Sequence, residues 1–437
     1  MKNTARAAAL TALERCRKSG AWSGVTIDAA IKKGELDQRD GALATRLCLG
    51  VLQNSSYLDY YIDLHCNQAL EPGLRDLLRL GAYQLLFLDK IPAHAAVSET
   101  VSLCRDRGFD RAAGLANAVL RRLAESAKEL PPIPGEGTAA WLSLRYSHPQ
   151  WLAERLIREH DYDFAEGFFR ENNKPSGLTI QVNRMKVSPE DYLRALTRGE
   201  YTFREDPALP GCIELDGGRV TELPGYDEGL FYVQDRAARA AVEAAGIRPG
   251  IRVLDACAAP GGKTLAAAMD LENMGRITAC DIHEKKLNLV RSNAQRLGIM
   301  NIETLARDAR SFDPAWENAF DVVLADVPCS GLGVIRKRPE IRWKQEKEIQ
   351  ALPEIQADIL ENLSRYVKPG GVLLYSTCTI LGEENRDQVE RFLRKHKNYF
   401  AEEFSLGDIQ SQNGCYEFWP QRDGTDGFFA AKLRREY

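Results

Sequence analysis

Residues 253–264 read Val-Leu-Asp-Ala-Cys-Ala-Ala-Pro-Gly-Gly-Lys-Thr, an apolar run that leads through small residues into a helical pattern. Small residues let a backbone approach a ligand closely, and the first amides of a helix have no partner within the helix. The stretch therefore predicts a strand, a ligand-binding loop and a helix, in that order. A nucleotide P-loop would need its first glycine at Cys257, and the stretch contains no G-x-G-x-x-G dinucleotide motif.

The sequence around this stretch alternates between apolar runs and helical patterns. The apolar runs are residues 252–254, 276–279, 320–324 and 371–375, and the helical segments are 264–270, 284–297 and 353–366. Such alternation indicates a parallel sheet covered by helices on both faces. Residues 236–437 are thus predicted to form a doubly wound, Rossmann-like α/β domain that binds its ligands beyond the carboxyl ends of the strands.

Two aspartates follow the predicted strands next to this loop. Asp281 comes 26 residues after Asp255, a spacing at which a strand-end carboxylate binds ribose hydroxyls. Asp308 follows the third apolar stretch and could face an adenine. Aspartate is also a favoured helix N-cap, so both could instead cap the helices after them. We favour the ribose role for Asp281 and leave the two interpretations of Asp308 open.

Two cysteines and a carboxylate end the next strands. One strand runs into Asp326-Val-Pro-Cys329 and another into Ser376-Thr-Cys378. A lone buried cysteine is usually a small hydrophobe, and Cys16, Cys48, Cys66 and Cys104, which lie in helical patterns, are predicted to be that. Cys329 and Cys378 instead fall in polar, non-periodic turns where catalytic residues of this architecture collect. Asp326 could take part in catalysis or only brace its own loop.

The first part of the chain has a different pattern. Residues 1–130 show apolar residues at helical spacing, as in Leu74, Leu77, Leu78, Gly81 and Ala82, so we predict an all-helical domain. The helix that contains these residues should end at Ile91-Pro92. Residues 131–171 begin with the proline- and glycine-rich PPIPGEG and are predicted to be a linker with short helices. Residues 172–235 alternate short strand patterns with glycine-rich turns and predict a small α+β module.

Composition and charge indicate a globular protein without an overall positive charge. The 437 residues are 44% hydrophobic and 27% charged, and the net charge is −4, so contacts with phosphates must come from local patches such as Arg336, Lys337, Arg338, Arg342 and Lys344. This run could hold RNA phosphates or be a solvated loop. No apolar run reaches the length of a membrane span, and no cysteine pair has zinc spacing. With no export signal recognised, we expect reduced thiols in a cytoplasmic protein without a metal.

Taken together, residues 255–264, 326–330 and 376–378 resemble the RNA cytosine-5 methyltransferases that use S-adenosylmethionine. The resemblance extends through Gly333-Val-Ile-Arg-Lys-Arg-Pro-Glu-Ile-Arg-Trp343 and Asp426-Gly-Phe-Phe429. The helical region, with residues 79–83 and 116–120, resembles the RNA-binding transcription factor NusB. Both halves in one chain resemble the bacterial 16S rRNA cytosine-5 methyltransferases of the Fmu/Sun type.

The resemblance implies a site and a substrate. The family's nucleophile falls on Cys378, Cys329 would help to resolve the covalent adduct, and Asp326 would contact the cytosine. The cofactor S-adenosylmethionine would bind Cys257, Ala258, Ala259, Pro260, Gly261, Gly262, Lys263, Asp281, Asp308 and Asp326. The partner would be 16S rRNA, and the target the cytosine at position 967.

The chemistry of the reaction asks for the same residue types. C5 of cytosine becomes nucleophilic only after a thiolate adds to C6, and the target base must be unstacked to be reached. Lys263 could stabilise charge nearby or only cap its loop. Two alternatives remain open at this point. One is the same chemistry on tRNA or another rRNA site. The other is a non-catalytic RNA-binding factor, which the intact Asp326, Cys329 and Cys378 disfavour.

Overall fold

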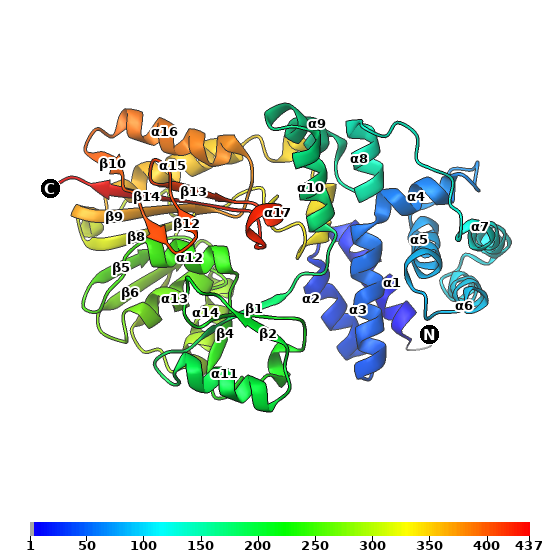
Figure 1. Ribbon diagram of the computed structural model, residues 1–437, viewed down its shortest axis with the longest axis horizontal. Coiled ribbons are helices and arrows are strands. Elements are labelled where there is room, and N and C mark those ends of the chain that lie inside the picture. Colours follow the sequence, from blue (N-terminus) through cyan, green and yellow to red (C-terminus); the bar gives the residue numbers. More distant parts are fainter. Residues whose placement is uncertain (1–3) are drawn as a thin grey trace. The chain divides into compact units, whose positions relative to one another are not determined.

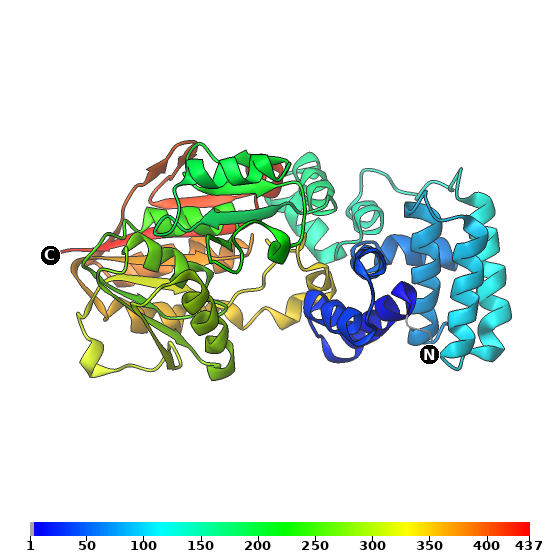
Figure 2. The ribbon, with the colours of Figure 1, turned by 90° about the horizontal axis from the view of Figure 1, so that it is seen from below.

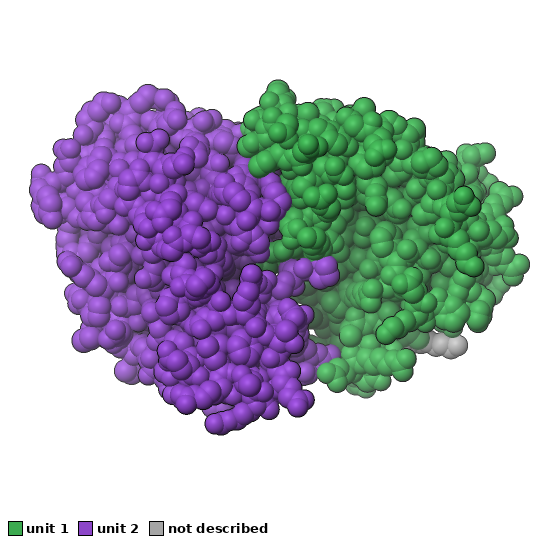
Figure 3. Space-filling model, viewed as in Figure 1, with its two compact units in different colours: residues 1–174, 335–346 green, residues 175–334, 347–437 purple. Residues whose placement is uncertain are grey.

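The computed structural model describes residues 4–437, so residues 1–3 of the predicted helical domain lie outside the description. The chain forms two compact units, which Figure 3 colours separately. Unit 1 consists of the described residues up to Lys174 together with Ile335–Glu346, and unit 2 consists of Pro175–Val334 and Lys347–Tyr437. A short segment from the C-terminal half of the sequence therefore belongs to the N-terminal unit.

Unit 1 is all-helical. Its helices are α1 (Ala5–Ser19), α2 (Ser23–Lys33), α3 (Gln38–Gln53), α4 (Ser55–Asp63), α5 (Pro72–Phe87), α6 (Ala93–Asp106), α7 (Ala113–Ser126), α8 (Ala139–Tyr146), α9 (Gln150–Glu159) and α10 (Tyr162–Asn172). The predicted apolar stripe of α5 is buried, with Leu77 and Leu78 fully covered. The helix ends at Phe87, and Pro92 is the N-cap residue of α6. Residues 131–171, predicted to be a linker with short helices, contain α8, α9 and most of α10.

Unit 2 begins with the small module. Its four antiparallel strands lie in the order β2-β3-β1-β4 and comprise β1 (Leu178–Val182), β2 (Phe203–Glu205), β3 (Cys212–Leu215) and β4 (Phe231–Val233). One helix, α11 (Pro189–Arg198), covers the sheet, and its Tyr192 and Leu196 pack with Ile180, Ile213 and Phe231. The predicted α+β character of this region is confirmed.

A large mixed sheet forms the rest of unit 2 (Figure 1). Its strand order is β10-β14-β9-β8-β5-β6-β7, with β13 paired to β14. The parallel strands are β5 (Arg252–Asp255), β6 (Arg276–Asp281), β7 (Ile302–Ala306), β8 (Phe320–Asp326) and β9 (Val367–Thr377). The antiparallel strands are β10 (Tyr399–Ala401), β13 (Cys415–Phe418) and β14 (Phe428–Arg435). The doubly wound parallel core is thus confirmed, and the antiparallel edge is an addition that strand–helix alternation did not predict.

Alternate residues of the strands supply two separate cores. Val253 and Leu324 point to the face covered by α12 (Arg236–Ala244), α13 (Gly262–Asp270) and α14 (Glu284–Leu297). Leu254 and Val323 point to the opposite face, which α15 (Leu352–Ser364) and α16 (Arg386–Lys395) cover. Figure 2 shows the helices on either side of the sheet. Because these strands are buried on both faces, their sequences are continuous apolar runs.

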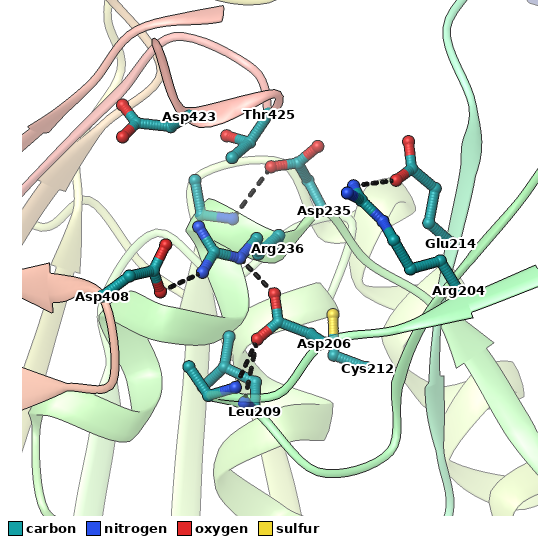
Figure 4. Close-up of polar contacts among 12 residues, drawn as sticks. Arg204, Asp206, Leu209, Cys212, Glu214, Asp235, Arg236, Asp408, Asp423 and Thr425 are labelled. Carbon is teal, nitrogen blue, oxygen red and sulfur yellow. Dashed lines mark hydrogen bonds and ion pairs between the residues drawn. The ribbon is translucent and has the colours of Figure 1, made fainter.

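Arg236 holds the small module to the large sheet. Its guanidinium contacts the Asp206 carboxylate and donates to Asp408 at 2.6 Å, in the turn between β11 (Ser405–Leu406) and β12 (Ile409–Gln410) (Figure 4). Asp206 also accepts the backbone amides of Ala208 and Leu209, so it organises the loop before β3. The neighbouring Asp235 caps α12 by accepting the amide of Ala237 at 2.9 Å.

Candidate active site

The loop after β5 is pinned to the next strands by its own amides. Ala258 donates its N–H to the carbonyl of Cys280 at 2.7 Å, and Ala259 donates to the Asp281 carboxylate at 3.3 Å. Gly261 has φ +115°, a conformation that residues with a side chain rarely adopt, and it leads directly into α13 at Gly262. The loop thus brings small residues and the first amides of a helix to the carboxyl edge of the sheet.

Asp281 and Asp308 lie at the same edge but are used differently. The Asp281 carboxylate accepts the amide of His283 at 2.8 Å as well as that of Ala259, and it does not cap α14, whose N-cap residue is His283. Asp308 is not a helix cap either, because its carboxylate accepts the amide and the guanidinium of Arg310 at 2.6–3.2 Å. This pairing with Arg310 holds the pKa of Asp308 below its usual value.

Lys263 and Asp326 form a partly buried ion pair. The Lys263 ammonium lies 2.8 Å from one Asp326 oxygen, and the hydroxyl of Ser376 donates to the other at 2.9 Å. The ammonium also lies 4.8 Å from the centre of the Phe428 ring. Burial alone would lower the pKa of Lys263, but the Asp326 carboxylate outweighs burial and raises it, so the residue stays a cation. The pair joins α13 to the ends of β8 and β9.

Cys329 and Cys378 meet across the ends of β8 and β9. Their sulfur atoms lie 3.2 Å apart as free thiols, and the backbone amide of Cys378 lies 3.3 Å from the sulfur of Cys329. The hydrogen bond to Cys378, together with burial, raises the pKa of Cys329 well above its usual value. Lys263 interacts electrostatically with Cys378, which contributes to the raised pKa of the lysine. The two predicted catalytic cysteines therefore share one site with Lys263 and Asp326.

The terminal Asp-Gly-Phe-Phe segment closes this site from the antiparallel edge. Gly427 donates its amide to the carbonyl of Gly333 at 2.9 Å, and Gly333 donates to the carbonyl of Cys378 at 3.0 Å. A Cβ on Gly333 would lie 1.8 Å from the Gly427 carbonyl oxygen. Only glycine fits at this position, so the backbone itself holds the loop after Cys329 against the turn that contains Cys378.

The arginines of the basic run make contacts with other residues of unit 1. Arg342 is buried and donates to the carbonyls of Gln53, Tyr146, Ser147 and Asn172 at 2.7–3.2 Å, and Arg338 stacks on Trp22 with its guanidinium carbon 3.9 Å from the ring centre. Arg336 faces Glu171 at 3.8 Å. The buried Arg342 therefore serves the packing of unit 1 and belongs neither to a phosphate patch nor to a solvated loop.

The four cysteines of unit 1 contribute to its hydrophobic core. Cys16, Cys48, Cys66 and Cys104 are buried, as predicted for small hydrophobes. Within residues 4–437, no cluster of His, Cys, Asp or Glu side chains could hold a metal ion. No helix in that same range combines the length and the hydropathy that a membrane span needs.

One polar residue near the cysteines was not predicted. Glu384 is 1% exposed, whereas the adjacent Glu383 is partly exposed, and the carboxylate of Glu384 bonds to residues on both cysteine loops. The sequence Gly382-Glu-Glu-Asn385 does not distinguish the two glutamates, because no periodic pattern shows which of them points inward.

Comparisons with known proteins agree with this geometry. Residues 3–125 match the NusB family, residues 148–221 match the ferredoxin-like domain of RsmF/B-like methyltransferases, and residues 246–434 match the 16S rRNA methyltransferase RsmB/F family. The probable ribosomal RNA small subunit methyltransferase B of Bacillus subtilis is 33% identical over 447 residues, covering 100% of this chain and 99% of that protein. The ribosomal RNA small subunit methyltransferase B of Erwinia tasmaniensis is 34% identical over 438 residues, covering 99% and 98%.

Solved structures show the same architecture. The crystal structure of PH0851 superposes with a TM-score of 0.85 at 28% identity and covers 100% of this chain and 99% of its own. A methyltransferase homologue from Pyrococcus horikoshii gives a TM-score of 0.60 at 27% identity, covering 67% of this chain and 97% of its own. With matches along its full length, a NusB-like helical part and two thiols beside a partly buried ion pair, this chain belongs to the RsmB/F family of 16S rRNA methyltransferases.

Proposed function

We propose that this enzyme methylates C5 of a cytosine in 16S rRNA, using S-adenosylmethionine and a covalent adduct with Cys378. The observation that carries the proposal is the pair of thiols 3.2 Å apart beside the Lys263–Asp326 ion pair. A methyltransferase that acts on an oxygen or an exocyclic nitrogen has no need of two adjacent thiols. Addition to C6 of a pyrimidine needs one thiol, and expulsion of the adduct needs a base close to it.

The residues at the sheet edge fit the cofactor. We assign its binding to residues 257–263, Asp281, Asp308 and Asp326. The fit rests on the small side chains of the loop, the positive φ of Gly261 and the Asp281 carboxylate, which has acceptor capacity beyond its two amide bonds. When bound, S-adenosylmethionine supplies an electrophilic methyl group. The carboxylate of Asp308 is shared with Arg310, so we give it a smaller part than Asp281.

The nucleophile is the thiolate of Cys378. The Lys263 ammonium favours negative charge at this sulfur, and a thiol proton on Cys329 can bond to it across the 3.2 Å gap. The sulfur forms a bond to C6 of the cytosine, and the electron pair of the C5=C6 bond moves into the ring. The Lys263 ammonium stabilises the ring that gains this charge by donating to it, and the Asp326 carboxylate orients the base by accepting from its exocyclic amine.

The product is released by the reverse movement of electrons. Once C5 carries the methyl group, a base removes its proton, and the C–H electron pair re-forms the C5=C6 bond. The bond from C6 to sulfur then breaks, and Cys378 leaves as a thiolate. The base is Cys329 once it has released its own proton, or a water that Cys329 positions, because its sulfur lies next to that of Cys378. By resemblance to the family, we expect the target to be the cytosine at position 967.

The two cysteines can be separated by trapping the adduct. Cys378→Ala is expected to give neither methylated RNA nor a protein–RNA adduct. Cys329→Ala is expected to complete methyl transfer and then stall, leaving a band that survives denaturing electrophoresis. The double variant should lose that band. A trapped band from Cys378→Ala, with none from Cys329→Ala, would reverse the two roles.

The modified base can be tested separately in cells. Bisulfite sequencing of 16S rRNA from a strain that lacks this protein should show the loss of one 5-methylcytosine, at position 967. Restoring the gene should restore that signal, and restoring the Cys378→Ala form should not. An unchanged bisulfite pattern would move the substrate to another RNA.

A further inference from the structure

A buried carboxylate lies behind the two cysteine loops. Glu384, at the end of the short 3-10 helix Gly382–Glu384, accepts the backbone amide of Ser330 at 2.9 Å and the side-chain amide of Gln356 at 2.9 Å. Its other oxygen lies 3.3 Å from the hydroxyl of Thr379. Ser330 directly follows Cys329, and Thr379 directly follows Cys378. One carboxylate therefore holds the residue after each cysteine.

Further contacts tighten this link. The hydroxyls of Ser330 and Thr379 lie 2.6 Å apart, and Gln356 also donates to the carbonyl of Pro328 at 3.0 Å. The hydroxyl of Tyr375, on β9, donates to the carbonyl of Glu384 at 2.5 Å. The side chains of this network are buried, whereas Pro328, which contributes only its carbonyl, is exposed. The separation of the two sulfur atoms thus depends on a hydrogen-bond network with Glu384 at its centre.

The same arrangement gives the two thiols different electrostatic surroundings. After the hydrogen bond to Cys378 and burial, the negative charge of Glu384 contributes to the raised pKa of Cys329. The Lys263 ammonium acts on Cys378 instead. The other titratable groups around Cys329 are Cys378 itself and Tyr375, with Asp326 held by Lys263. A thiolate is therefore favoured at Cys378 and disfavoured at Cys329.

We propose that Glu384 is a positioning residue that assigns the two cysteines their different roles. Its hydrogen bonds fix the loops that carry the sulfur atoms, and its charge adds to the effects that disfavour a thiolate at Cys329 while Cys378 attacks. This inference rests on the proposed function, because only a reaction that needs one thiolate and one thiol gains from the difference.

Glu384→Gln separates the charge from the hydrogen bonds. The amide oxygen can still accept from Ser330 and Gln356, and the amide nitrogen can donate to the Thr379 hydroxyl, which is both donor and acceptor. In the Cys378→Ala background, we measure alkylation of Cys329 by iodoacetamide against pH, with the modified peptide identified by mass spectrometry. Loss of the charge should lower the pH midpoint of alkylation by about one unit. The matched control is Glu390→Gln, an exposed glutamate of α16, which should leave the midpoint unchanged.

Activity supplies the second measurement. In the chain with both cysteines, Glu384→Gln should lower kcat for rRNA methylation by about tenfold or more and leave KM for the RNA unchanged, because the RNA does not contact this buried group. If the Glu384→Gln chain does not fold cooperatively, Thr379→Val tests the hydrogen bonds alone. It keeps the charge and the side-chain shape, so it should slow adduct formation without moving the alkylation midpoint.

The outcomes are distinct. An unchanged alkylation midpoint in a folded Glu384→Gln chain, or an unchanged rate of adduct formation in Thr379→Val, overturns the proposal. Alkylation involves no RNA, so a shifted midpoint together with no trapped adduct from either cysteine would contradict the proposed function and leave the electrostatic role of Glu384 in place.

Discussion

Lys263 shows how one buried charge organises its neighbours. An ammonium removed from water is costly unless it is paired, and here the Asp326 carboxylate and the face of the Phe428 ring offset that cost. Asp326 is held in turn by Ser376, so the cation and its partner have little freedom. A fixed positive charge beside Cys378 is a condition of the proposed reaction, since a solvated lysine would be screened and mobile.

At the residue scale, we predict that Asp281→Ala weakens cofactor binding by about 1.5 kcal/mol or more, roughly tenfold in Kd, the usual scale for hydrogen bonds to a charged group. The carboxylate holds the amides of Ala259 and His283, so its loss also loosens the binding loop. Isothermal calorimetry with S-adenosylmethionine checks this. Asp308→Ala is the comparison, with a smaller expected loss because Arg310 already pairs that carboxylate. Equal affinities for Asp281→Ala and the wild type would remove Asp281 from the site.

Asp255 gives a prediction about pH. Burial raises the pKa of Asp255 to about 7, against about 4 in an unfolded chain. Its contribution to stability is therefore complete below about pH 4 and is lost as the pH rises toward 7, because the unfolded chain ionises first. Asp255→Asn can still accept the hydroxyl of Thr264 and does not ionise, so its urea midpoint should fall less between pH 5 and 8 than that of the wild type. The exposed Asp216→Asn should keep the wild-type slope. Parallel curves for all three proteins would show that Asp255 ionises normally.

Part of this residue-scale detail could be predicted from the sequence. Asp326, Cys329 and Cys378 follow apolar runs, and the ends of parallel strands must meet at one sheet edge. The partner of Lys263 could not be predicted, because Asp326 is 63 residues away and which side chains meet depends on strand order and rotamers. Glu384 was missed for the same reason, since its burial follows from a short turn without periodicity.

At the scale of elements, the segment Ile335–Glu346 is part of unit 1. It contains the 3-10 helix Pro339–Trp343, whose Ile341 and Arg342 are buried. Helix α2 contributes as well, since the hydroxyl of Ser23 donates to the Glu340 carboxylate at 2.7 Å. A run of five cations within nine residues reads as a surface patch in any sequence-based analysis, because backbone carbonyls, which leave no trace in the sequence, are what Arg342 binds.

We predict that Arg342→Met lowers the free energy of unfolding by about 2–4 kcal/mol, because it removes the donor to the carbonyls of Gln53, Ser147 and Asn172, while that of Tyr146 keeps the side-chain amide of Asn173. Urea unfolding followed by far-UV circular dichroism, which reports on the helices, checks this. Arg158→Met, at an arginine whose side chain is 69% exposed, should change the free energy by less than about 0.5 kcal/mol. If the two variants unfolded alike, the carbonyls around Arg342 would have found other donors.

At the scale of the whole molecule, the fold of each region could be predicted from the sequence, but the assignment of distant segments to one unit could not. Periodicity identified the helical part, the α+β module and the doubly wound core, because each depends on local hydrophobic spacing. The antiparallel edge strands β13 and β14 are separated only by the four-residue helix α17 (Pro420–Asp423), so the alternation of strands with long helices gave no sign of them. The assignment of Ile335–Glu346 to unit 1 also escaped prediction, since a contact between distant segments has no local pattern.

This organisation decides how the role of unit 1 can be tested by truncation. A chain that starts near Trp151 would lose the carbonyls of Gln53, Tyr146 and Ser147 that hold Arg342, and would keep α9 and α10 without the rest of their core. The structure favours residues 175–437 with 335–346 replaced by a glycine–serine linker of equal length. This chain retains the cores on both faces of the large sheet, so it should bind S-adenosylmethionine within about twofold of the full chain, a difference of about 0.4 kcal/mol.

The same truncated chain should methylate 16S rRNA poorly when RNA is limiting, because the NusB-like part is expected to add RNA affinity while methyl transfer belongs to the C-terminal sheet. A cooperative thermal transition must first show that it is folded. Initial rates over a range of RNA concentrations then separate affinity from chemistry. A raised KM with an unchanged kcat assigns RNA binding to unit 1. Rates equal to those of the full chain at limiting RNA would give unit 1 another task, and a lost kcat at saturating RNA would mean that the segment 335–346 supports the geometry of the cysteine loop that precedes it.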